Sequence, residues 1–87
     1  MNNWQEICNV EDFVKWKYND TPYRIVAHFR EDRGHWEAIF TSIYPGSYLI
    51  RGNAGGGNKG RMIAVASAKQ FMRDNQYGCP PPTEYEA

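Results

Sequence analysis

The chain has 87 residues, and its 10 basic and 10 acidic side chains give a formal net charge of zero. A content of 41% hydrophobic and 15% aromatic residues suits one small globular domain and excludes a disordered chain. No apolar stretch approaches the roughly 20 residues of a membrane span, and the N-terminal residues lack the pattern of a secretory leader. We therefore expect one intracellular domain over residues 1–79, in the cytoplasm or the nucleus, and a flexible proline-rich tail over 80–87.

The residue types that usually hold metals or perform catalysis are few. Cys8 and Cys79 lie near opposite ends of the chain, which fits neither a disulfide framework nor a zinc motif, so both are predicted to be free thiols. His28 and His35 are the only histidines, and no nucleophile, base and oxyanion site come together in the pattern. We expect no catalytic residue, no metal and no cofactor.

The first predicted element is a helix over residues 10–18. Asn9 would cap its first turn, and the two acids after Val10 suit the positive end of a helix dipole. The Asn-Asp-Thr-Pro run over 19–22 would end it, because a residue before proline is disfavoured in helical geometry. The side chains at helical spacing are Val10, Phe13, Val14 and Lys17.

Three strands are predicted next, over residues 23–30, 35–44 and 47–52. The first two place alternate residues on opposite faces of the sheet, as in "YRIVAHFR" and "HWEAIFTSIY". The connections are short: "EDRG" forms a turn over 31–34, and a Pro-Gly pair within Tyr44–Ser47 predicts a type II turn. Short connections indicate an antiparallel meander.

The last predicted element is a helix over 58–76, rich in good helix formers and stopped by Gly78. Its predicted buried stripe contains Ile63, Ser67 or Ala68, and Phe71. The predicted class is therefore α+β, in the order α-β-β-β-α, with a three-stranded antiparallel sheet packed on two helices that share one face.

A glycine-rich loop precedes this last helix. Gly55, Gly57 and Gly60 satisfy the spacing G-x-G-x-x-G, but no strand is predicted after the helix, so the loop does not fit the βαβ unit of a dinucleotide site. Two interpretations stay open. The glycines either permit a connection with positive φ angles, or they begin a phosphate-facing helix, since Lys59 and Arg61 follow and no acid occurs before Arg73.

Three motifs together resemble a double-stranded RNA-binding domain over about residues 10–76. They are "TPYRI" at the first predicted strand, "RGHW" between the first two strands, and "NKGRMIAVASAKQFM" in the last helix. Pro22-Tyr23 and Gly34-His35 match the family's pattern, as do Ser67-Ala68 with Phe71 and Met72. The sequence departs from the family where its lysine pair is diluted to Lys59-Gly60-Arg61.

The resemblance implies a small non-catalytic module that binds double-stranded RNA by shape and phosphate contacts. It places Gly34 and His35 at the ribose face of a minor groove, and Lys59 and Arg61 at phosphates. On the predicted first helix it implies contacts from Asp12 and Lys15.

A protein-interaction module on the same fold is the alternative. Val26, Ile39 and Ile43 fall on the outward faces of the predicted strands, which would leave an apolar patch away from the helices. Trp4 has no partner in the pattern and would either pack against the domain or mark a binding surface. Two functions therefore stay open at this point. The protein is either an RNA-binding module, or a regulator or inhibitor that binds another protein.

Overall fold

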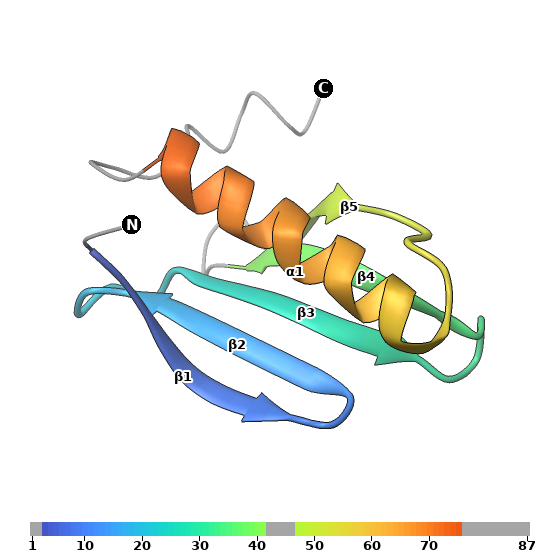
Figure 1. Cartoon of the computed structure of the whole chain (residues 1–87). Coiled ribbons are helices and arrows are strands. Elements are labelled where there is room, and N and C mark those ends of the chain that lie inside the picture. The colour runs from blue at the N-terminus through green and yellow to red at the C-terminus, as the bar shows by residue number, and fades with distance from the viewer. Residues whose placement is uncertain (1–2, 42–46, 76–87) are drawn as a thin grey trace.

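The computed structural model describes residues 3–41 and 47–75 (Figure 1). The described residues form one five-stranded antiparallel sheet in the order β1-β2-β3-β4-β5, followed by one helix. The class is α+β, as predicted. The elements are β1 (Trp4–Val10), β2 (Phe13–Tyr18), β3 (Arg24–Arg30), β4 (His35–Thr41), β5 (Ser47–Arg51) and α1 (Gly57–Asp74).

The helix predicted over residues 10–18 is wrong. This segment contains the end of β1, a two-residue turn and the whole of β2. In β2 the buried side chains are Val14, Trp16 and Tyr18, which is a spacing of two and not of a helical turn. The β-branched and aromatic content of this stretch also favours a strand. The sheet therefore has five strands where three were predicted, and one helix covers it where two were predicted.

The later elements agree with the sequence patterns. β3, the turn over 31–34, β4, β5 and α1 lie within one to three residues of the predicted bounds, as far as the structure describes them. The predicted Pro-Gly turn, Ile43, Gly78 and the tail lie outside the described residues. The helix ends at Asp74, where the Asn75 side chain donates to the carbonyl oxygen of Phe71 at 2.8 Å.

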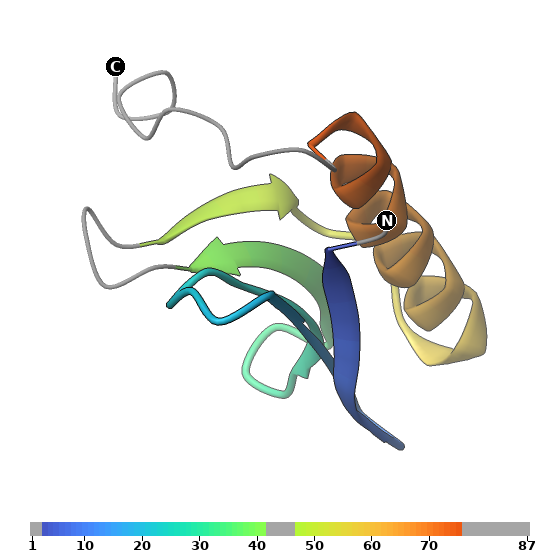
Figure 2. The ribbon, with the colours of Figure 1, turned by 90° about the vertical axis from the view of Figure 1, so that its left-hand side faces the viewer.

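The helix packs across one face of the sheet, over β3, β4 and β5 (Figures 1 and 2). Its buried stripe is made largely of small residues, which lets the helix axis lie close to the strands. Ala27 and Ala38 are paired directly beneath this layer and are fully buried. The buried helix residues are Gly60, Ala64, Ala68 and Met72. Of the residues predicted for this stripe, Ala68 is buried, whereas Ile63, Ser67 and Phe71 are only half-buried beside it.

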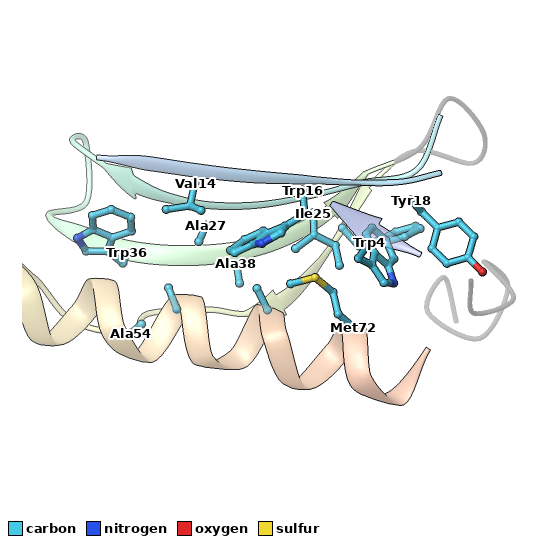
Figure 3. Packing of buried hydrophobic residues seen from close by; sticks show 13 residues of the cluster. Trp4, Val14, Trp16, Tyr18, Ile25, Ala27, Trp36, Ala38, Ala54 and Met72 are labelled. Carbon is cyan, nitrogen blue, oxygen red and sulfur yellow. The ribbon is translucent and has the colours of Figure 1, made fainter. Parts of the chain in front are cut away.

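Large side chains fill the two ends of the core (Figure 3). Trp4 and Tyr18 meet edge to face at 5.0 Å near Met72, at the C-terminal end of the helix. Trp4 Nε1 also donates to the carbonyl oxygen of Asn75 at 3.4 Å. Trp36 lies at the opposite end of the core (Figure 3). Trp4 is only 5% exposed, so it packs against the domain and does not mark a binding surface.

The glycines before the helix have a structural role. Gly55 and Gly57 have φ angles of +94° and +64°, which agrees with the first of the two interpretations left open for this loop. Gly60 lies against the preceding loop: a Cβ atom there would be 1.9 Å from the carbonyl oxygen of Gly55. The G-x-G-x-x-G spacing thus arises from two turn positions and one close backbone contact.

Candidate functional site

The face of the sheet that points away from α1, called the outer face below, has no layer of described residues over it (Figure 2). The strand register aligns its side chains in rows that run across the strands. One row contains Gln5, Lys17, Arg24 and Thr41, and the next contains Cys8, Lys15, Val26, Ile39 and Leu49. Two further rows contain Phe13, His28 and Glu37, and then Arg30 and His35.

Basic and acidic side chains are unevenly distributed over the molecule, although their charges cancel in the whole chain. In the described part of the outer face the cations are Lys15, Lys17, Arg24 and Arg30, and the only carboxylate is Glu37. Of the other acids in this part of the chain, five occupy the turns at residues 11–12, 20 and 31–32, Glu6 is on β1 and Asp74 is on α1. A chain of zero net charge therefore presents a cationic face.

Lys17 and Arg24 lie directly opposite each other in the β2–β3 ladder, and Lys15 is two residues further along the same strand. Nη1 of Arg24 donates to the carbonyl oxygens of Thr21 at 2.6 Å and Tyr23 at 2.8 Å, which holds the guanidinium near the 19–23 turn. Among the described residues, neither lysine is in an ion pair. Like charges directly opposite in a sheet are destabilising, so this arrangement favours an anionic partner.

Glu37 is the centre of a second cluster on the same face. It is 4% exposed, and its neighbour on this face, His35, is also buried at 8%. Its Oε2 accepts from Nε2 of His35 at 3.1 Å, and its Oε1 lies 3.3 Å from Nη1 of Arg30 and 3.7 Å from Nε2 of His28. Burial alone would raise the pKa of Glu37, but the His35 hydrogen bond and the Arg30 charge outweigh it and lower that pKa.

Arg30 extends this cluster to the 31–34 turn. Its Nε and Nη2 donate to the two oxygens of Asp32 at 3.1 and 3.0 Å. This hydrogen-bonded pair lowers the pKa of Asp32 and raises the pKa of Arg30. Glu37 and Asp32 thus neutralise Arg30, while Lys15, Lys17 and Arg24 keep their charge. Within the described residues, no group of three histidine, cysteine or carboxylate side chains has the arrangement of a metal site.

Arg61, the predicted phosphate ligand, has internal partners. Its Nη2 donates to Oδ1 of Asn9 at 2.7 Å and to the carbonyl oxygen of Val10 at 3.0 Å, and its guanidinium lies 5.6 Å from the centre of the Trp36 ring. These contacts tie the start of α1 to the β1–β2 hairpin. The side chain borders a hollow whose lining is Glu11, Asp12, Phe29, Trp36, Gly57, Asn58 and Arg61.

The residues predicted from the RNA-binding resemblance lie on different surfaces. Lys59 is exposed on the helix and Lys15 is on the outer face, on the other side of the sheet. His35 is buried against Glu37, and Asp12 is exposed in the β1–β2 turn. Gly34 is exposed with a φ of +71°, and its carbonyl oxygen lies beside Gly56. The structure brings Asp12 and Arg61 to one hollow, but not the other residues.

The residues predicted for a protein interface are partly together. Val26 and Ile39 are directly opposite on the outer face, and Leu49 follows in the same row at 55% exposure. Ile43 lies outside the described residues. Sequence reasoning missed Lys17 and Arg24 as site residues because the helix predicted over 10–18 hid their pairing; alternation in "VKWKY" is the signal that would have found them.

Comparison with family models, with curated proteins and with solved structures found no match to this chain. The one helix of the described residues, α1, is not long and apolar enough to span a membrane. The resemblance to double-stranded RNA-binding domains stays a prediction from sequence motifs.

Proposed function

We propose that the protein is a non-catalytic RNA-binding module that holds RNA phosphates on the outer face of its sheet, at Lys15, Lys17 and Arg24. One observation carries this proposal: Lys17 faces Arg24 directly, with no carboxylate in either of the two rows that contain these three cations. Phosphate contacts from lysine and arginine supply most of the affinity of sequence-independent binding.

The neighbouring side chains favour unpaired RNA over a duplex. Val26, Ile39 and the exposed Leu49 form an apolar row immediately beside the cations, and Phe13 lies in the next row. Open sheets with apolar and aromatic side chains accept splayed bases, whereas a duplex hides its bases and is bound by shape. The helix that the resemblance assigns to a minor groove is here a strand, which also supports unpaired RNA.

A protein partner is the second candidate, because the same apolar row contains the exposed Leu49 beside the half-buried Val26 and Ile39. Leu49 at 55% exposure extends the Val26–Ile39 pair into one patch. The adjacent cations restrict that partner to an acidic surface. A second copy of this chain stacked on the outer face would bring lysines against lysines, so self-association by this face is disfavoured.

The test is a fluorescence-anisotropy titration with a 20-nucleotide unpaired RNA, the matched RNA duplex and the matched single-stranded DNA, each at two salt concentrations. Three phosphate contacts on a single strand predict a log–log salt slope of about −2. We expect unpaired RNA to bind more tightly than the duplex. Lys17→Gln combined with Arg24→Gln should weaken binding at least tenfold and make the slope shallower.

Arg33→Gln is the matched control, because Arg33 is exposed in the 31–34 turn and away from the rows that contain the three cations. This variant should bind within twofold of the wild type. Absence of binding to all three nucleic acids at low salt by the folded protein would overturn the proposal. The binding site would instead be the start of α1, as the resemblance implies, if the duplex bound more tightly than unpaired RNA. In that case Lys59→Ala should lower the affinity and Lys17→Gln should not.

A further inference from the structure

A second cationic surface runs along the exposed side of α1, which points away from the sheet (Figure 1). Its residues recur at helical spacing and are all exposed, so they form one stripe along the helix. We call it the helix face; its members are Lys59, Met62, Ala66, Lys69 and Arg73.

The charge of the helix face is not neutralised by the rest of the domain. Among the described residues, Lys59, Lys69 and Arg73 are in no ion pair. Nη2 of Arg73 donates to Oε1 of Gln70 at 2.7 Å, which leaves its charge uncompensated. The one acid of α1, Asp74, accepts from the Gln70 side chain at 3.0 Å.

The apolar side chains of the helix face add a contact surface for bases. Met62 is 69% exposed, which is the largest exposure among the large hydrophobic side chains described. It borders a hollow with Val65 and Ala66 that is flanked by Arg61 and Lys69. The outer face has the same combination, in which cations border exposed apolar side chains. A flexible thioether adapts readily to irregular partners.

The two cationic faces are separate. The helix covers one side of the sheet, so the helix face and the outer face point in opposite directions (Figures 1 and 2). At the end of the molecule where α1 begins, two hollows between these faces are lined by four acids and by two cations that already have internal partners. The acids are Glu11, Asp12, Glu31 and Asp32, and the cations are Arg30 and Arg61. One RNA strand passing around this end would meet carboxylates, which disfavours a single continuous path.

We infer that the helix face is a second phosphate-binding surface, so that one molecule holds two RNA segments on opposite sides and bridges them. This inference rests on the proposed RNA binding of the outer face. It assigns to Lys59, Lys69 and Arg73 the role that Lys15, Lys17 and Arg24 have on the sheet. The consequence is that binding sites for two strands exist without a protein dimer.

Native mass spectrometry of the full chain with a 20-nucleotide unpaired RNA tests this stoichiometry, because it counts protein and RNA in each complex. A surface assay adds the functional readout: one RNA is immobilised, and capture of a second, fluorescent RNA is measured. The wild type should form complexes of one protein with two RNAs and should capture the second strand.

Two sets of substitutions separate the faces. Lys59→Gln, Lys69→Gln and Arg73→Gln together, and Lys17→Gln with Arg24→Gln, should each leave one RNA per protein and reduce capture at least tenfold. All five positions lie outside the buried core, and circular dichroism checks that both variants fold.

The outcomes distinguish the two proposals. If the wild type binds a single RNA that is lost only in the sheet variant, the bridging inference is wrong and the outer-face function stands. If the single RNA is lost only in the helix variant, the outer-face function and the bridging inference are both wrong, and the helix face is the binding site. Two RNAs found only in complexes with two proteins would also overturn bridging by one molecule.

Discussion

Lys17 on β2 faces Arg24 on β3 in a directly opposed pair of the antiparallel ladder. Two like charges in this position cost stability, and cross-strand pairs typically contribute about 0.2–1 kcal/mol in either direction. The Arg24 contacts with two carbonyl oxygens relieve part of the repulsion by holding the guanidinium at the 19–23 turn. A pair that lowers stability, and that is accessible from the open side of the sheet, is expected where binding an anion compensates for it.

Lys17→Glu should therefore change stability and binding in opposite directions. The new carboxylate would face Arg24, so the free energy of unfolding should rise by about 0.5 kcal/mol. The same substitution places a negative charge among the phosphate ligands, and the affinity for unpaired RNA should fall at least tenfold. Urea unfolding and anisotropy titration measure the two effects. Arg33→Glu makes the same charge change in the 31–34 turn and should weaken binding less than threefold.

The later elements were predicted correctly because the spacing of side chains in each sequence segment fits only one kind of element. β3 and β4 alternate over seven residues each, and α1 continues through 18 residues of good helix formers. Alternation also predicted the open side of the sheet, because it puts Val26 and Ile39 on the outward faces of neighbouring strands, where they lie opposite each other.

The failure over residues 10–18 has a physical cause. In the short run from Val10 to Tyr18, apolar side chains satisfy both a helical spacing and a spacing of two. Pairing decided the outcome: Val14 and Trp16 each have a partner in β3, and burying them against the sheet completes the core. That pairing is non-local, so the local sequence does not contain it. With a helix predicted in place of β2, the Lys17–Arg24 pair and the cationic face were not predictable.

The contacts of Arg61 indicate a structural role and not the predicted role of a phosphate ligand. Its hydrogen bonds to Asn9 and Val10 and its position over Trp36 join the helix to the first hairpin. Arg61→Ala should lower the free energy of unfolding by about 2 kcal/mol, since each hydrogen bond contributes about 1 kcal/mol and the ring contact about 0.5–1 kcal/mol. Lys59→Ala, two residues earlier and exposed, should change it by less than about 0.5 kcal/mol. Equal stability of the two variants in urea unfolding would contradict this role.

Gly60 should resist a substitution that normally stabilises helices. Replacing glycine by alanine inside a helix usually adds about 1 kcal/mol. Here the new methyl group would lie 1.9 Å from the Gly55 carbonyl oxygen and 3.1 Å from the Trp36 ring, so the helix start or the loop must move. Gly60→Ala should therefore lower the free energy of unfolding by about 1–3 kcal/mol.

A second substitution in α1 serves as the control for Gly60→Ala. Ala66 is exposed on α1, so Ala66→Gly measures helix propensity alone and should cost about 1 kcal/mol. If Gly60→Ala instead raises the thermal midpoint, the close contact with Gly55 does not restrict the helix, and the glycine has no packing role.

Glu37 should make stability depend on pH in the acidic range. Its pKa in the folded protein is lowered, despite burial, by the His35 hydrogen bond and the Arg30 charge. A lowered pKa means that the unfolded chain binds the proton more readily. The contribution is therefore fully present above the ordinary pKa of about 4.3 for glutamate, and it is lost as pH falls through the lower folded value.

Glu37→Gln tests this contribution directly. The variant should be less stable at neutral pH, because Arg30 and His35 lose an ionised partner, and its stability should fall less steeply than that of the wild type as pH drops below about 5. Asp32→Asn is the matched comparison, since its partner is also Arg30 but the pair is exposed. About 1 M salt should suppress the Asp32 effect more than the Glu37 effect, because screening is weaker for buried charges. Urea unfolding from pH 7 to pH 3 measures both; an unchanged acid dependence in Glu37→Gln would show that the buried carboxylate does not link folding to pH.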